Sequence, residues 1–161
     1  MVHRKGPTMK AVDVLIQARN LLSDKNRWTK NYMKTVRNGK ECFCAAGAVC
    51  HEAGVLEGEK TYTNFTGNVF MNVMCGIVPV TAASNSAIRE AEALGEHARA
   101  AHTALKYLRA ASGHDSFIYV NDVKGYDAVM KMFDVAIRNA KRRHINGDRK
   151  KPTISELGLA Q

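Results

Sequence analysis

Three cysteines and a histidine fall within a short stretch of this chain, at Cys42, Cys44, Cys50 and His51. Thiolates and imidazoles are the usual ligands of zinc, and a thiolate is also a strong nucleophile. The stretch therefore raises two chemistries, a metal site and a cysteine-dependent active site. Each of them needs further groups placed nearby, and the rest of the sequence decides whether such groups exist.

The metal interpretation fails on spacing. In a helix that begins near Cys44, this residue and His51 share a face but lie two turns apart, which is about 10 Å at 1.5 Å per residue. Zinc ligands sit about 2 Å from the metal, so the two side chains cannot hold one ion. Cys42 and Cys44 could hold one edge of a metal, but no second ligand pair follows. We expect neither a metal nor a cofactor.

The thiol interpretation places Cys44 in the first turn of a helix, where free N–H groups and the helix dipole lower a thiol pKa. An enzyme of this kind would use Cys44 as nucleophile, with Asn121 or Asp122 orienting a histidine. No local signature links a histidine to Cys44. The alternative is a small buried residue next to Gly47, where two elements pack closely. We expect the alternative, and hence no catalytic residue.

Asn121 and Asp122 also have two interpretations. Both are natural turn formers, so the pair can form an Asx turn that leads into the last helix. The functional alternative places both side chains at a pocket rim, near Trp28 and the start of the helix that follows Cys44.

Charge is unevenly distributed along the chain. Residues 1–40 hold ten Lys/Arg and two Asp, a net of +8; residues 41–137 hold seven basic and eleven acidic residues, a net of −4. Residues 138–161 hold seven basic and two acidic residues, a net of +5, and the three segments sum to +9. Two basic ends around an acidic middle predict an anionic partner: nucleic acid, a nucleotide or an acidic host protein.

Two basic segments, residues 19–40 and residues 138–151, are the predicted ligand-binding regions, because cations bind phosphates and aromatic rings stack on bases. The alternative is that Trp28 is a core residue, and in that case only the cations bind the ligand. Neither segment carries a signature of a sequence-specific nucleic-acid reader, so a backbone or shape binder is expected. The predicted ligand-binding residues are Arg27, Trp28, Lys30, Tyr32, Lys34, Arg37, Arg138, Lys141, Arg142, Arg143, Lys150 and Lys151.

Apolar periodicity predicts a mainly α protein: a compact domain of four helices. They are expected over residues 9–22, from residues 42–44 to 54, from residues 84–86 to about 110, and over residues 125–143. Residues 55–83 are predicted to be partly irregular or to form a short β-hairpin. Residues 1–143 form one domain in this interpretation, and residues 144–161 form a basic tail through which a homo-oligomer could assemble.

Location follows from what the chain lacks. Its longest apolar stretch, "VFMNVMCGIVPV", is short and broken by Gly76 and Pro79, so we expect no membrane span. The first ten residues have no apolar segment of the kind that export signals carry. Four cysteines in a chain without such a signal are expected to be reduced. The expected location is the cytoplasm.

Several short motifs occur in a recognisable order: Trp28-Thr29, then Cys44-Ala45-Ala46-Gly47-Ala48, then Asn121-Asp122 and "FDVAI". The order resembles a family of small uncharacterised proteins of bacteriophages and actinobacteria, with Trp-Thr, Trp-Cys-x-x-Gly-Ala and Trp-Asn-Asp motifs. Phe43 and Val120 stand where that pattern has tryptophan. The resemblance implies a phage accessory protein in the host cytoplasm, and it implies no reaction.

Together these points predict a non-enzymatic phage-type binding protein that engages a host component or an anionic ligand through its basic segments. A cysteine-dependent enzyme using Cys44 and a protein-binding inhibitor of a host factor are the alternatives.

Overall fold

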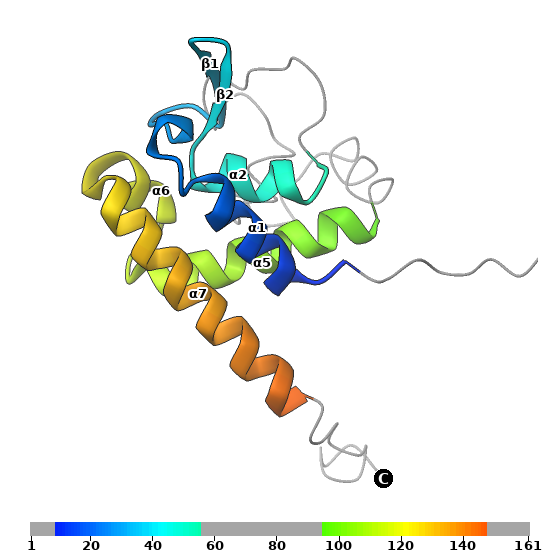
Figure 1. Cartoon of the computed structure of the whole chain (residues 1–161). Helices are drawn as coiled ribbons and strands as arrows, with labels where there is room; N and C mark the ends of the chain where they lie inside the picture. The colour runs from blue at the N-terminus through cyan, green and yellow to red at the C-terminus, as the bar shows by residue number, and fades with distance from the viewer. Residues whose placement is uncertain (1–8, 56–94, 148–161) are drawn as a thin grey trace, which may run out of the picture.

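The computed structural model describes residues 9–55 and 95–147, and these residues are mainly helical with one small β-hairpin (Figure 1). The short helices η1 and η4 are a 3₁₀-helix and a π-helical turn. In chain order the elements are α1 (Ala11–Leu21), η1 (Lys25–Arg27), β1 (Lys34–Arg37), β2 (Lys40–Phe43), α2 (Ala45–Glu52), α5 (Glu96–Ser112), α6 (Phe117–Tyr119), η4 (Val120–Lys124) and α7 (Tyr126–Gly147).

The core lies where α1, α2, α5 and α7 meet (Figure 1). The apolar stripe of α1 buries Leu15, and the stripe of α7 buries Phe133. Alanines of α5, among them Ala101, are fully buried and let the other helices approach closely. An ion pair between Arg19 and Asp134, at 2.5 Å, joins α1 to α7 outside this core.

The described hairpin precedes α2 and lies in the first basic segment, which the sequence predicts to be a ligand-binding region. Its strands are antiparallel, with Lys34 opposite Phe43 and Arg37 opposite Lys40. The turn between them is Asn38-Gly39, and both residues have positive φ, 50° and 72°. Asn-Gly is the strongest sequence signal for this type of two-residue turn. The hairpin predicted within residues 55–83 falls outside the described residues, apart from Val55.

The predicted second helix is confirmed as α2, which begins after Cys44 and is followed by Gly54 at φ +73°. The first helix starts two residues later than predicted. Its N-cap is Lys10, whose side chain makes no capping hydrogen bond.

The count of four helices is wrong for the part of the chain between α5 and α7. A short helix, α6, capped by Ser116, and the π-helical turn η4 occupy it where only a turn was predicted. The predicted start of the third helix, at residues 84–86, is outside the described ranges, in which α5 begins at Glu96. Helix α7 continues to Gly147, so the predicted domain boundary after residue 143 falls inside a helix. No helix of residues 9–55 and 95–147 is both long and apolar enough to cross a membrane.

Candidate functional site

The side chain of Asn121 makes four hydrogen bonds and joins three distant segments. Its Oδ1 accepts from the indole Nε1 of Trp28 at 2.9 Å and from the backbone N–H of Ala45 at 3.0 Å. Its Nδ2 donates to the carbonyl of Thr29 at 3.1 Å and to Oδ1 of Asp122 at 2.7 Å. Both lone pairs and both N–H groups are therefore used, and Asn121 is almost fully buried. We call this network the Asn121 junction.

Asp122 and Cys44 complete the Asn121 junction at its edge. Oδ1 of Asp122 also accepts from the backbone N–H of Asn31 at 3.1 Å. The sulfur of Cys44, which is the N-cap of α2, accepts from the backbone N–H of Gly47 at 3.3 Å. A neighbourhood of Asn121, Trp28 and the start of this helix is what the functional alternative predicted. The Asx turn is wrong, because Asn121 bonds mainly to segments far along the chain.

The hollow beside Cys44 is too small for a substrate. It measures about 10 Å³, which is the room that a single water molecule requires. No histidine lies among the described residues that line it, so the histidine that the enzyme alternative requires is not beside Cys44 in this part of the structure. The lining residues are Asn31, Tyr32, Cys44, Ala46, Phe117, Ile118, Asn121 and Asp122.

Burial makes the Cys44 thiol a poor nucleophile. The residue is only 4% exposed, and the loss of solvent raises the pKa of its thiol to about 12, against hydrogen bonds from Gly47 and Ala46 that lower it. The position at a helix start thus acts in the predicted direction but is outweighed by desolvation. Asn121 and Asp122, the other residues of the enzyme alternative, already bond to backbone groups of Ala45, Thr29 and Asn31.

This burial predicts a thiol that stays protonated at neutral pH. Iodoacetamide should modify Cys44 slowly in the folded protein and rapidly in denaturant, as peptide mass spectrometry would measure. Because folding raises the pKa from 9.0 to about 12, the contribution of Cys44 to stability is complete below pH 9 and is lost as the pH rises toward 12. Cys44→Ala should therefore lose less stability in that range than the wild type. Rapid alkylation of folded protein at neutral pH would contradict this account.

The other cysteines of the described residues are also reduced and buried. Burial raises the pKa of the Cys50 thiol, and the sulfur of Cys42 donates to the carbonyl of Asn26 at 3.1 Å. Within residues 9–55 and 95–147, no group of three or more His, Cys, Asp or Glu side chains could hold a metal ion. The stretch that raised two chemistries is thus largely packing in the described structure.

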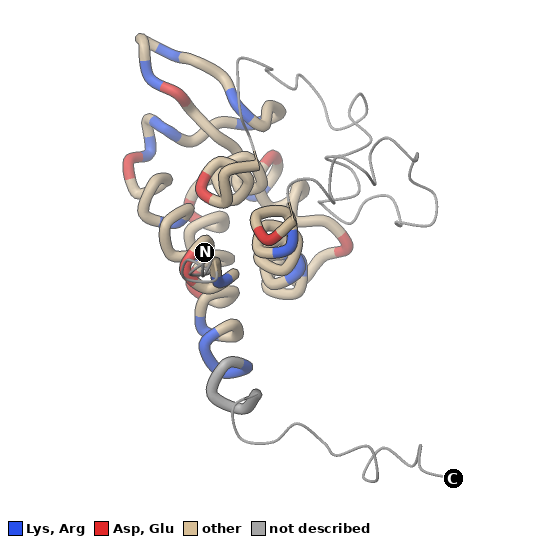
Figure 2. The backbone as a smooth tube through the Cα atoms, turned by 90° about the vertical axis from the view of Figure 1, so that its right-hand side faces the viewer, with Lys and Arg blue, Asp and Glu red and all other residues tan. Residues whose placement is uncertain are grey.

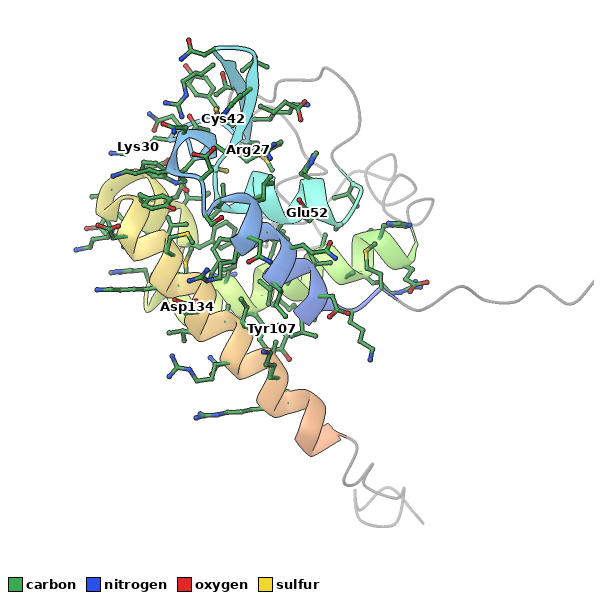
Figure 3. All side chains as sticks on the ribbon, in the orientation of Figure 1. Arg27, Lys30, Cys42, Glu52, Tyr107 and Asp134 are labelled. Atoms are coloured by element: carbon green, nitrogen blue, oxygen red, sulfur yellow. The ribbon has the colours of Figure 1, made fainter. Side chains whose placement is uncertain are left out.

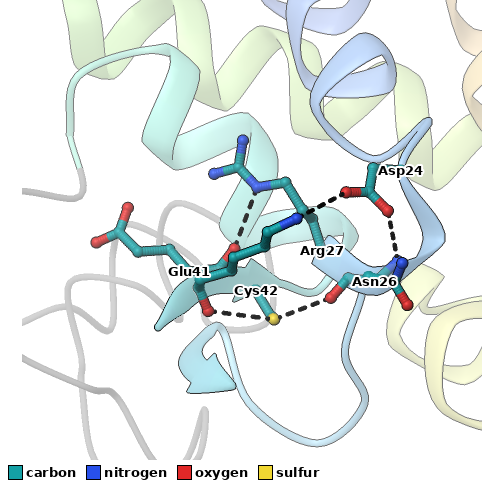
Figure 4. A network of polar contacts seen from close by, with 6 residues as sticks. Asp24, Asn26, Arg27, Glu41 and Cys42 are labelled. Carbon is teal, nitrogen blue, oxygen red and sulfur yellow. Dashed lines mark hydrogen bonds and ion pairs between the residues drawn. The ribbon is translucent and has the colours of Figure 1, made fainter. Parts of the chain in front are cut away.

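Most cations of the first basic segment are engaged within the protein. Arg27 donates to the carbonyl of Glu41 at 3.2 Å (Figure 4). The ammonium group of Lys40 lies 3.9 Å from the carboxylate of Asp24. Lys34 pairs with the Glu41 carboxylate, and this hydrogen bond lowers the pKa of Glu41. Arg37 donates to the carbonyl of Trp28. These contacts fix the hairpin against η1 and leave fewer charges for a ligand.

The aromatic residues of this segment differ in accessibility. Trp28 is half-buried and packs against the core, and its ring meets that of Tyr126 edge-on at 5.8 Å. Lys30 lies over the Trp28 ring at 5.8 Å from its centre. Tyr32 is 44% exposed. The alternative of Trp28 as a packing residue therefore has structural support, whereas Tyr32 is open to solvent.

The second basic segment lies at the other end of α7. Tyr126, which contacts the carbonyl of Leu22 near the first segment, and Arg142 are separated by about 24 Å along the helix at 1.5 Å per residue. The two predicted regions are therefore separate. Figure 2 shows basic residues close together in the last described turns of α7. Exposed cations there are Arg138, Lys141, Arg142 and Arg143, and Lys150 and Lys151 lie outside the described residues.

A hollow of about 390 Å³ lies between this end of α7 and α5, and we call it the α5–α7 groove. Three of its lining residues are cations, and none of its described lining residues is acidic. The structure describes no ion pair between those three cations and a carboxylate within residues 9–55 and 95–147. The lining residues are Thr103, Lys106, Tyr107 and Ala110 of α5, and Asn139, Arg142 and Arg143 of α7.

Comparison with known proteins places the chain in a family. The model of a family of unknown function, DUF6197, matches residues 6–139. The chain belongs to this family. No curated protein and no solved structure matches the chain. The part matched by DUF6197 contains the Asn121 junction and ends before Arg142 and Arg143.

Sequence reasoning missed Lys106 and Tyr107, the two residues through which α5 gives the groove a charge and an aromatic wall (Figure 3). A signal was present. From residue 97 to residue 112 the chain has Arg99, Lys106 and Arg109 and no Asp or Glu. A helical stretch with cations and no carboxylates, next to the basic end of another helix, predicts a positively charged interface. The fold was needed to show that the two helices face each other here.

Proposed function

We propose that this protein is a non-enzymatic binding protein, and that an anionic partner contacts it at the α5–α7 groove. The single observation that carries the proposal is the composition of the groove, which Lys106, Arg142 and Arg143 line with no acidic residue in the described lining. Like charges held close together repel each other, and an anion relieves that repulsion while it gains charge-assisted hydrogen bonds.

The difference between the two basic segments supports the α5–α7 groove as the place where the anion binds. Lys34 can reach a ligand only by leaving Glu41, and Arg37 only by leaving the carbonyl of Trp28. Arg138 and Lys141 are exposed beside the groove and add to its positive potential. The proposal therefore assigns the first contact with the anion to α5 and α7, with the segment around Trp28 in a secondary role.

A phage-type origin, action on a host component and a cytoplasmic location are part of the same proposal. The support for origin is the order of the motifs around Trp28, Cys44 and Asn121, which resembles phage and actinobacterial proteins. The support for the location is that the cysteines of the described residues are free thiols.

The test is a titration of labelled single- and double-stranded DNA and RNA, and of nucleotides, at two salt concentrations. Each phosphate that the groove neutralises releases counterions, so affinity must fall as salt rises. For duplex DNA and three neutralised phosphates, the fall between about 50 and 200 mM salt is about 40-fold.

Binding that does not depend on salt would contradict the electrostatic account. No binding of any probe at low salt would exclude nucleic acids and nucleotides together. An acidic host protein would then be the remaining anionic partner, and the protein would act as an inhibitor of a host factor.

A further inference from the structure

The α5–α7 groove has the dimensions of a site for one small ligand. Its volume of about 390 Å³ lies within the range of about 300–1,000 Å³ that small-molecule sites occupy. Thr103, Lys106, Tyr107 and Ala110 are spaced at intervals of three and one, so they form one face of α5. Residues 139, 142 and 143 form the facing surface of α7 in the same way. Two rigid helices thus hold the walls of the groove.

The polar groups of the groove are mainly hydrogen-bond donors. Lys106, Arg142 and Arg143 have no acceptor atoms at all, and the guanidinium groups offer forked pairs of N–H donors that match phosphate oxygens. Thr103 can donate through its hydroxyl, and Asn139 through its amide. A set of this kind selects a ligand with several anionic oxygens, as in a phosphate ester.

Tyr107 gives the groove a second kind of wall. The residue is half-buried and packs against the hydrophobic core, so its ring is held in place before a ligand arrives. Figure 3 shows Tyr107 where α5 approaches α7. Ala110, three residues further along α5, lines the same hollow with a small side chain. An aromatic face with free space beside it suits a planar ring, which stacks on it.

We infer that the α5–α7 groove binds one nucleotide, with its phosphates on Lys106, Arg142 and Arg143 and its base on Tyr107. This inference rests on the proposed function and narrows it from an anionic partner to a nucleotide. The cations converge on a hollow with one aromatic wall, and this arrangement favours a single small ligand. A long nucleic acid is bound by cations and aromatic rings that repeat along an open surface.

Isothermal titration calorimetry tests the inference with ATP, GTP, CTP and UTP, and with inorganic triphosphate as the probe that lacks a base. The nucleotides should bind one per chain and about tenfold more tightly than inorganic triphosphate, since stacking on an aromatic side chain is available only to them. Tyr107→Leu should remove that advantage and leave the affinity for inorganic triphosphate unchanged. Tyr107→Phe keeps the ring and should bind as the wild type does.

Exposed Arg142 allows a second test that does not disturb the core. Arg142→Gln should weaken nucleotides and inorganic triphosphate by the same factor, about tenfold. If Tyr107→Leu does not fold, Arg142→Gln still tests whether the anion binds at the α5–α7 groove. Equal affinity of the wild type for nucleotides and inorganic triphosphate would overturn the nucleotide assignment and leave the proposed function standing. Binding of long nucleic acid without any binding of nucleotides would do the same. No binding of nucleotides, inorganic triphosphate or nucleic acid would overturn the nucleotide assignment and leave an acidic host protein as the anionic partner.

Discussion

Gly47→Ala is expected to unfold the protein or to lower its free energy of unfolding by more than about 3 kcal/mol. A Cβ atom at this position would lie 1.8 Å from the carbonyl oxygen of Met33, and both the oxygen and its carbon belong to a buried backbone segment. The same carbonyl accepts from the backbone N–H of Cys44 at 3.3 Å, so moving it breaks the start of α2. In an open helix, this substitution would stabilise by about 1 kcal/mol.

Urea-induced unfolding measures this effect, with Gly39→Ala as the matched control. Gly39, unlike Gly47, has a positive φ, +72°, but nothing lies within 4 Å of its Cβ position. Its substitution should therefore cost only the strain of a left-handed residue, about 1–2 kcal/mol. Equal losses for the two variants would show that the close approach at Met33 is not what Gly47 permits.

Asn121→Leu is expected to lower the free energy of unfolding by about 3–5 kcal/mol. Leucine has the branched shape of asparagine and the same number of side-chain heavy atoms, but it leaves the indole N–H of Trp28, the N–H of Ala45 and the carbonyl of Thr29 without their partner. Each buried polar group that loses its partner costs about 1–3 kcal/mol. The loss also frees the segment around Trp28 from the start of α2.

Trp28 is the single tryptophan of the chain, so its fluorescence and its one indole N–H resonance report on the Asn121 junction directly. Asn121→Leu should speed exchange of that indole proton with solvent. Asp122→Asn is the control, because its amide oxygen can still accept from the N–H of Asn31, and it should cost less than about 1 kcal/mol. An unchanged unfolding midpoint for Asn121→Leu would contradict the role given to the junction.

The helices could be predicted because their apolar residues recur at helical spacing, as Val129, Phe133, Ala136 and Ala140 do in α7. The hairpin could also have been predicted, since Asn38-Gly39 specifies its turn. Lys34 pairs with the Glu41 carboxylate and Arg27 bonds to a backbone carbonyl, so fewer cations of the first basic segment are available to a ligand than the sequence alone indicates.

The Asn121 junction and the α5–α7 groove depend on contacts that no local pattern encodes. Trp28 and Asn121 are 93 residues apart, and their hydrogen bond arises only when α1, α2 and η4 have packed. The Trp-Thr and Asn-Asp motifs contain the residues of the Asn121 junction, because the carbonyl of Thr29 also accepts from Asn121. Lys106 and Tyr107 belong to no sequence motif. They line the same hollow as Arg142 only because α5 packs against α7.

The central claim is that an anion binds at the α5–α7 groove, and the most direct measurement compares two double variants that each lose two positive charges. Inorganic triphosphate is titrated into the wild type, Arg142→Gln/Arg143→Gln and Lys25→Gln/Lys30→Gln. The first variant should bind at least about tenfold more weakly, since a hydrogen bond to a charged group contributes about 1.5–3 kcal/mol. The second should stay within about twofold, because its lysines lie near Tyr126 and Trp28, at the far end of α7 and beyond a Debye length. Equal losses in both variants, or a loss only in the second, would contradict the claim.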